Sequence, residues 1–318
     1  MSAYDVIGLG VSTLDILALV DHFPAGEEIQ RAHDMALQGG GPVATAIVAL
    51  ARLGARTAML DAVGGDWRGR LICDELSREG VDTAHLRHHN ECSSATACVL
   101  VERRTGTRTI VYLPGSTPEL SPDDLGPGLI ESARILHLNG RHWEACLAAS
   151  RRARAAGVRV SFDGGADRYR PEMRQLLPLT DIAIVARDFA ARYTAEDDPG
   201  RAAQALQREG PGLVVVTDGI RGSWMSPADG SPFHQPAYQA RPLVDTTGCG
   251  DAYHGAFLYA LLRGRPVEEA ASLASAAAAL NARQLGGRAG LPSLEEVESF
   301  LGSSPIPYPR HQDGSRPS

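Results

Sequence analysis

The chain has 318 residues, of which 43% are hydrophobic and 22% are charged, and its formal net charge is −7. These values are typical of a globular protein, and no apolar run approaches the roughly 18 residues that a membrane span needs, so no membrane partner is expected. All 31 basic residues are arginine, which excludes lysine Schiff bases, pyridoxal phosphate and the lysine-dependent Walker-A and protein-kinase schemes. Because these arginines are scattered along an acidic chain, no nucleic-acid partner is expected either.

The cysteines and the N-terminus predict a cytoplasmic protein. The five cysteines are odd in number and form no CxxC pair, which favours reduced thiols. The sequence MSAYDVIGLG has no basic stretch followed by an apolar one, so no secretory signal is expected. The histidines at 85, 88 and 89 follow a predicted helix end in what looks like a loop, and no acidic or thiolate ligand at fixed spacing supports a zinc site there.

Short apolar strands alternate with amphipathic helices along most of the chain. Strands are predicted at 5–10, 57–63, 134–138, 158–162, 181–185 and 212–217, and helices at 43–53, closed by Gly54, and at 67–79, stopped by Gly80. This βαβ rhythm predicts an α/β protein with a parallel sheet covered by helices on both faces.

Two stretches, about 14–37 and 94–113, look instead like extended strands without crossover helices. The segments SATACVLVE and RTIVYL are expected to form a hairpin around residues 104–106. We therefore predict a small β-lid beside one larger core domain at 1–302. Residues 303–318 are rich in proline and serine, which predicts a disordered tail.

The segment DTTGCGDAYHGAFLYALL, residues 245–262, carries the strongest chemical signal. A glycine-rich turn made of Gly248, Cys249 and Gly250 runs into a helix that is apolar at helical spacing from Ala252 onward. Unpaired N–H groups and the positive end of a helix dipole form an anion site suited to a phosphoryl group in transfer. Asp251 lies in the first turn, where a carboxylate can take a proton from an attacking hydroxyl. On spacing alone, an ordinary glycine turn with a first-turn acid remains the alternative.

This segment resembles the DTxGxGD signature of the ribokinase, or PfkB-type, carbohydrate kinases. Residues 39–55, GGGPVATAIVALARLGA, resemble the other signature of that family, and residues 63–83 and 214–225 resemble further stretches of it. The order and spacing hold from about residue 5 to 301. The resemblance implies a ribokinase-like three-layer αβα sandwich with a central, mainly parallel sheet and a small β-sheet lid. It also implies ATP as donor, Mg²⁺, and transfer to a sugar hydroxyl.

The resemblance also assigns site residues by position. Asp251 would be the catalytic base, and the anion hole would consist of Gly248, Cys249 and Gly250. The sugar side would contain Asp15, Gly40, Gly41 and Thr45, and the ATP side would contain Thr217, Gly219 and Gly222. A monovalent cation such as K⁺ would bind at Asp245 and Thr247. Lids of this kind often pair between subunits, which implies a homodimer.

Three positions depart from the family pattern. Thr45 replaces a usual asparagine, so the donor and acceptor pair of an amide is lost there. Cys249 replaces a usual alanine, and its thiol is expected to make activity sensitive to oxidation. Residues 186–189, ARDF, stand where many members carry Asn-x-x-Glu near the metal and the phosphates, so metal handling is expected to differ, with Asp188 as a partial substitute.

The segments GGGPVATA, HQPAYQ and LGGRAGLP (285–292) resemble the 6-deoxy-6-sulfofructose kinases. In that comparison Arg141 matches an arginine for the anionic end of the substrate, although a guanidinium would accept a phosphate equally well. Arg141 as a simple strand-end residue is the alternative, and Tyr112 stands where that branch is expected to have asparagine. The alternatives are a kinase for a neutral sugar or a sugar phosphate (fructose, ribose, ketodeoxygluconate, tagatose 6-phosphate) and a catalytically weak sugar or nucleotide sensor. A nucleoside acceptor is disfavoured because only 5% of the residues are aromatic.

Overall fold

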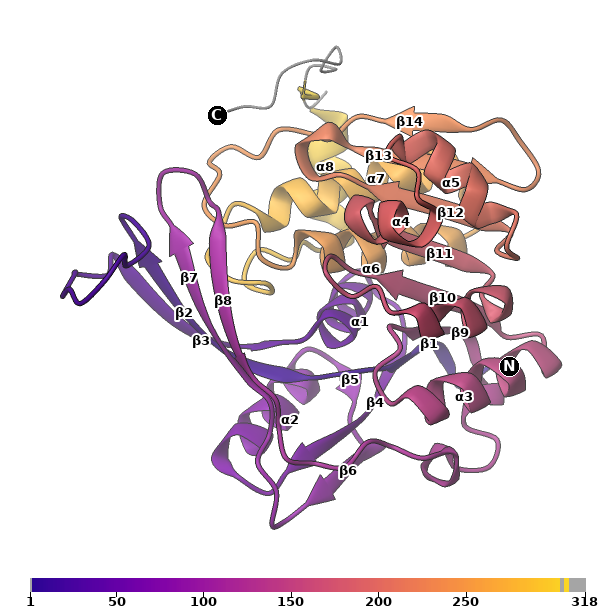
Figure 1. The fold of residues 1–318 in the computed structure, drawn as a ribbon, viewed down its shortest axis with the longest axis horizontal. Coiled ribbons are helices and arrows are strands. Elements are labelled where there is room, and N and C mark those ends of the chain that lie inside the picture. Colours follow the sequence, from indigo (N-terminus) through magenta and orange to yellow (C-terminus); the bar gives the residue numbers. More distant parts are fainter. Residues whose placement is uncertain (1, 304–305, 309–318) are drawn as a thin grey trace.

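The computed structural model describes residues 2–303 and 306–308, which form a large sheet, a small sheet and helices (Figure 1). The strands of the large sheet are β1 (Tyr4–Leu9), β4 (Thr57–Gly64), β5 (Val81–Asp82), β6 (Leu86–His89), β9 (Ala133–Leu138), β10 (Arg159–Gly164), β11 (Ile182–Ala186), β12 (Leu213–Thr217), β13 (Ser223–Pro227) and β14 (Phe233–Gln235). Their order is β14-β13-β12-β11-β10-β9-β1-β4-β5, with β6 beside β4. All neighbours are parallel except at the β12–β13 and β13–β14 pairs.

Helices cover both faces of this sheet, as predicted. One face carries α1 (Pro42–Arg52), α2 (Trp67–Arg78), α6 (Cys249–Leu262), α7 (Val267–Asn281) and α8 (Leu294–Gly302), and the other carries α3 (Trp143–Ala155), α4 (Arg187–Thr194) and α5 (Pro199–Gln207). Five 3₁₀ helices are also described: η1 (Pro122–Leu125), η2 (Ile130–Ser132), η3 (Pro171–Gln175), η4 (Leu177–Leu179) and η5 (Gly219–Arg221). Successive strand residues point to opposite faces, so Ile184 packs in one core and Val185 in the other. The predicted three-layer αβα architecture is confirmed.

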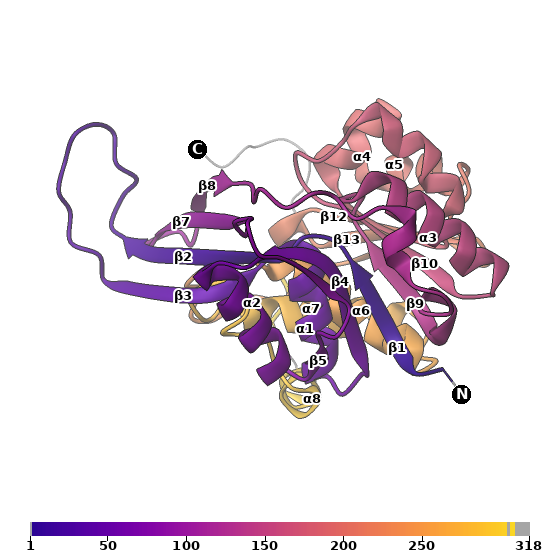
Figure 2. The same cartoon turned by 90° about the horizontal axis from the view of Figure 1, so that it is seen from below.

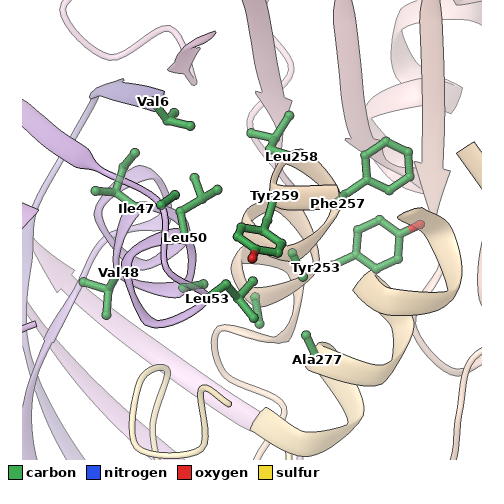
Figure 3. Close-up of a cluster of buried hydrophobic side chains, with 14 of the residues drawn as sticks. Val6, Ile47, Val48, Leu50, Leu53, Tyr253, Phe257, Leu258, Tyr259 and Ala277 are labelled. Carbon is green, nitrogen blue, oxygen red and sulfur yellow. The ribbon is translucent and has the colours of Figure 1, made fainter. Parts of the chain in front are cut away.

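Helices α1 and α6 pack closely against each other (Figure 3). Ile47 and Leu50 of α1 and Leu258 of α6 are fully buried there. A Cβ atom on Gly255 would lie 2.7 Å from the backbone oxygen of Ala46, so only glycine permits this approach. The contact positions the N-termini of both helices at the same cleft, because the residues at each N-terminus line it.

The small sheet has the order β3-β2-β7-β8, and it contains β2 (Thr13–Val20), β3 (Asp34–Gly40), β7 (Thr96–Glu102) and β8 (Arg108–Leu113). Strands β2 and β3 extend away from the large sheet (Figure 2). The predicted hairpin is observed as the antiparallel β7–β8 pair. One face of the sheet is buried through Leu17, Val99 and Val101.

The histidine segment and the C-terminal tail differ from the rest in how they compare with expectation. The predicted loop around the three histidines is wrong in part, since His88 and His89 belong to β6 and pair with β4 in parallel register. Most of the predicted disordered tail, residues 304–305 and 309–318, lies outside the described residues. Among the helices that the structure describes, none has the length and apolarity required to cross a bilayer.

Candidate active site

A cleft of about 1360 Å³ lies between the carboxyl ends of the large sheet's strands and the small sheet. The predicted site residues that line it are Asp15, Gly41, Thr217, Gly219, Gly222, Thr247, Gly248, Cys249, Gly250 and Asp251. Four others, Gly40, Thr45, Arg141 and Asp245, are not among its lining residues. Ligands of open α/β sheets bind at this edge, and the cleft joins the predicted sugar and ATP sides.

The glycine-rich turn forms the N-terminus of α6. Gly248 is the N-cap, with φ of 71°, and a Cβ atom there would lie 2.6 Å from the backbone of Gly287. The helix begins at Cys249, three residues earlier than the apolar pattern indicated. The N–H groups of this first turn have no intrahelical acceptor, and the residues that carry them line the cleft, as the predicted anion hole requires.

Asp251 lies in the first turn of α6 with its side chain partly buried. Burial and the nearby Asp163 carboxylate raise the pKa of Asp251 to about 7, against the opposing influence of Arg168 and Arg108. A carboxyl group with this pKa is ionised in a large fraction of molecules at neutral pH and is more basic than an ordinary aspartate. It therefore suits a general base.

Asp15 lines the cleft from β2 and is 9% exposed. The Thr13 hydroxyl donates a hydrogen bond of 2.6 Å to its Oδ1 atom. Burial raises the pKa of Asp15, whereas this hydrogen bond and Arg288 lower it. A Cβ atom on Gly40 would lie 2.1 Å from Asp15 Oδ2. Gly40 therefore acts at the site by leaving room for the carboxylate.

Two predicted sugar-side residues are engaged with protein groups. The Thr45 hydroxyl accepts a hydrogen bond of 3.2 Å from Arg288 Nε, and Thr45 is 1% exposed. Arg141 Nη1 donates to Glu119 Oε1 at 3.0 Å. Its guanidinium is thus already paired with a carboxylate, and this placement does not support a free anion clamp at Arg141.

Asp245 is fully buried and forms hydrogen bonds with the turn that precedes the predicted anion hole. Its Oδ1 atom accepts hydrogen bonds from Thr247 N (2.8 Å) and Thr247 Oγ1 (2.7 Å), and its Oδ2 atom accepts one from Gly286 N (2.8 Å). Among the described residues no basic side chain forms an ion pair with it. A buried carboxylate without a basic partner fits a bound monovalent cation, because an uncompensated buried charge is costly.

At the other end of the cleft, Thr217 ends β12, and Gly219 and Gly222 form the η5 turn. Small side chains of α7 and the adjoining turn, Ala278, Ala279 and Ala282, line the same end. The motif comparison did not identify these alanines, since small residues at helical spacing carry no chemical signal by themselves.

Two positions that depart from the family pattern, Asp188 and Cys249, lie at the cleft. Asp188 lines the cleft, and its Oδ2 atom accepts a hydrogen bond of 2.7 Å from Asp167 N. Burial raises the pKa of Cys249 to about 12, which disfavours the thiolate, but the residue lines the cleft, so the sensitivity to oxidation stays a prediction. Two arginines that the sequence motifs do not include, Arg108 and Arg168, also line the cleft. The absence of lysine is the signal that could have found them, since arginine must supply every permanent positive charge.

Comparisons with known proteins identify the family of this chain. The model of the pfkB family carbohydrate kinases matches residues 5–294. An uncharacterized sugar kinase of Archaeoglobus fulgidus is 32% identical over 252 residues, which cover 76% of this chain and 98% of that protein. A 5-dehydro-2-deoxygluconokinase of Shouchella clausii is 27% identical, with 94% of this chain and 95% of the relative covered. The structure of Arabidopsis thaliana ribokinase complexed with ribose and ATP has a TM-score of 0.80 and 27% identity, covering 94% of this chain and 99% of that one. The chain therefore belongs to the pfkB family of carbohydrate kinases, and it is a sugar kinase.

Proposed function

We propose that the protein transfers the γ-phosphoryl group of ATP to a sugar hydroxyl, with Asp251 as the catalytic base. The observation that carries the proposal is that Asp251, whose pKa is raised to about 7, lies next to the N–H groups at the start of α6. Asp15 lines the same cleft. These are the base, the anion site and the acceptor-side carboxylate that phosphoryl transfer to an alcohol needs.

In this mechanism the acceptor hydroxyl lies between Asp15 and Asp251. Asp15 accepts a hydrogen bond from the sugar and orients it, and Asp251 takes the proton of the attacking hydroxyl. The new bond joins the sugar oxygen to the γ-phosphorus, and the bond from that phosphorus to the β–γ bridging oxygen breaks, so ADP leaves. The N–H groups of 248–250 hold the phosphoryl oxygens during transfer. The small sheet acts as a lid that excludes water, which would compete as acceptor.

Mg²⁺ and K⁺ are part of the proposal. When bound with ATP, Mg²⁺ neutralises charge that develops on the phosphates, and it needs only one or two carboxylates because phosphates and water complete its coordination. Asp188, which lines the cleft, is the residue we assign to it, in place of the usual Asn-x-x-Glu. We assign K⁺ to Thr247 and to the buried carboxylate of Asp245, which has no basic ion-pair partner in the part of the chain that the structure describes.

We keep an anionic ketose such as 6-deoxy-6-sulfofructose as the first acceptor to test. If the acceptor is anionic, Arg168 is better placed than Arg141 to meet it, because Arg168 lines the cleft and Arg141 is paired with Glu119. Arg168 Nη1 lies 3.5 Å from Asp163 Oδ2, a long contact that leaves donors free. Fructose, ribose, ketodeoxygluconate and tagatose 6-phosphate remain the alternatives.

We further propose a homodimer formed through the small sheet. Leu37, Ile16, Cys98 and Val111 are cross-strand neighbours in one row over all four strands. Leu37 is 51% exposed and Val111 68% exposed, so this outer face is apolar and open. A second copy of the sheet would cover it. The five free cysteines fit a cytoplasmic location, which we also propose.

The test is ADP release from Mg-ATP against a panel of these acceptors with adenosine added. We expect one sugar to stimulate release, and Asp251→Asn to lower its kcat by about 10²- to 10⁴-fold without loss of the folded state. Asp123→Asn, on the exposed η1 turn, is the control and should leave kcat unchanged. Near-normal turnover by Asp251→Asn would contradict the base assignment. Tight sugar or nucleotide binding without any turnover would instead favour a sensor.

A further inference from the structure

Arg288 is the largest fully buried side chain of the described residues, with 2% exposure. It lies between α7 and α8, within the stretch LGGRAGLP (285–292), and it is distant along the chain from the signature at 39–55. Arginine is almost never buried to this degree unless it is paired. The groups that it pairs with therefore indicate what it does.

Its guanidinium holds three elements on the sugar side of the cleft. Nη2 donates to the backbone oxygen of Gly40 at 2.8 Å, at the end of β3. Nε donates to the Thr45 hydroxyl at 3.2 Å, in the second turn of α1. Nη1 lies 3.3 Å from Glu75 Oε1, on α2. The backbone N–H of Arg288 also donates to the Gln38 side chain at 3.3 Å.

The chain before α1 is shaped around this guanidinium. A Cβ atom on Gly39 would lie 2.2 Å from Arg288 Nη1, so glycine is needed there for the contact. The Gly39 N–H donates to Glu75 Oε2, the other oxygen of the carboxylate that pairs with Arg288. The next residue, Gly40, leaves room for Asp15. The guanidinium is therefore separated from the Asp15 carboxylate only by this glycine segment.

The charge of Arg288 also reaches the two carboxylates of the proposed mechanism. It lowers the pKa of Asp15 and of Asp251, opposing the effect of burial on each. The acidic groups that face it are Asp15 from β2, Glu75 from α2, Glu79 directly after α2, and Asp251 from α6. Arg288 itself is not among the residues that line the cleft.

We propose that Arg288 is a positioning residue for the acceptor sugar, which it serves by holding Gly40 and Thr45 in place and thereby setting the position of Asp15. The inference rests on the proposed kinase function. It gives Thr45 a role different from that of the usual asparagine, since its hydroxyl serves as an acceptor for Arg288 Nε.

The first test compares Arg288→Met with Arg52→Met. Arg52 is the matched control because it also joins the segment between α7 and α8 to the end of α2, but away from the cleft. Its Nη1 donates to Leu291 O at 2.8 Å, and its Nε donates to Glu79 Oε2 at 2.7 Å. We expect Arg288→Met to raise the acceptor KM about 10- to 100-fold, the loss expected for one or two charged hydrogen bonds, while the KM for ATP changes less than about twofold. Arg52→Met should lower the melting temperature and leave both KM values unchanged.

Two further variants distinguish positioning from a general loss of structure. Arg288→Lys keeps the charge but loses the planar fork, so its acceptor KM should lie between those of the wild type and Arg288→Met. It also carries the test if Arg288→Met does not fold. Thr45→Val should raise the acceptor KM in the wild type and add little in the Arg288→Met background. Additive effects of the two substitutions would overturn the indirect role of Thr45 and indicate that it contacts the sugar.

Hydrogen exchange of the peptide that spans residues 36–48 separates this inference from the proposed function. Exchange at the Gly39 amide should be faster in Arg288→Met than in the wild type and unchanged in Arg52→Met, because only the first variant frees Glu75. Faster exchange in an enzyme without sugar turnover would support the positioning network and contradict the kinase function. Unchanged exchange together with an unchanged acceptor KM would overturn the inference while turnover upholds the kinase.

Discussion

The guanidinium of Arg108, on the small sheet, donates a hydrogen bond of 2.9 Å to the hydroxyl of Thr246, two residues before the anion hole. The backbone oxygen of Gly106 accepts a second bond, of 3.0 Å, from the same hydroxyl. The tip of the β7–β8 hairpin is thus joined to the turn that would hold the transferred phosphoryl group. This places a permanent positive charge of the proposed lid beside the site of the reaction.

Arg108→Met is therefore expected to lower kcat/KM by at least about tenfold, because a charged donor near the transferring phosphoryl group is lost. Arg104→Met is the matched control, since Arg104 lies in the same hairpin, is 86% exposed and is 3.6 Å from Glu102. Steady-state kinetics at saturating ATP check this. Equal losses in the two variants would show that the hairpin as a whole, and not the Arg108 charge, is responsible.

The raised pKa of Asp251 predicts a specific pH dependence. A base must be deprotonated to act, so kcat/KM should rise with pH and level off above a pKa of about 7. Asp163→Asn removes a like charge and should move this acid limb to lower pH, and Arg168→Met removes an opposing charge and should move it to higher pH. Shifts in the same direction for both variants would contradict the electrostatic origin of the raised pKa.

Titration of Asp251 should also make the stability of the folded protein depend on pH, and stability should fall over the pH range in which activity rises. Because the pKa of Asp251 in the folded state lies above the value of 3.8 for an ordinary aspartate, the folded state binds this proton more tightly than the unfolded state does. The contribution of Asp251 to stability is therefore present at low pH and is lost as the pH rises toward 7. Asp251→Asn should weaken this loss, so that the melting temperature of the variant exceeds that of the wild type at pH 8 and not at pH 4. A wild type that gains stability relative to the variant over this range would contradict the raised pKa.

An anionic acceptor should distinguish the two candidate arginines. Arg168→Met should raise the KM of such an acceptor by about tenfold or more, whereas Arg141→Met should leave it nearly unchanged because Glu119 already neutralises Arg141. A neutral sugar supplies the internal control, since its KM should respond to neither change in this way. The reverse ranking would restore Arg141 as the anion clamp.

The apolar outer face of the small sheet predicts a dimer that one charge should disrupt. Val111→Asp places a carboxylate at the β8 end of the apolar row that also contains Cys98 and Ile16, and it should shift the protein from dimer to monomer in sedimentation velocity. Ser231→Asp, on the exposed loop between β13 and β14 of the large sheet, is the control because it adds the same charge outside the small sheet. A wild type that is monomeric at high concentration would rule out this interface.

The local signals of the sequence account for much of the fold and of the site. Apolar periodicity and glycine stops predict α1 and α2 within a residue or two, and the two glycines on either side of Cys249 predict the turn before Asp251. Such signals act within a few residues along the chain. They could be detected without knowledge of what packs against them.

The tertiary structure alone decided which side chains meet. Thr45 and Arg288 are 243 positions apart in the chain, and only folding brings the hydroxyl to the guanidinium. The same is true of the pairing of Arg141 with Glu119 and of the Asp163 carboxylate beside Asp251. Periodicity and motif spacing describe the local backbone, whereas the charge state of a group depends on its burial and on all charged neighbours in space. The sequence by itself therefore predicted the six central strands of the large sheet, α1, α2 and the family motif, and the tertiary packing determined how basic Asp251 is and which arginines remain free to act.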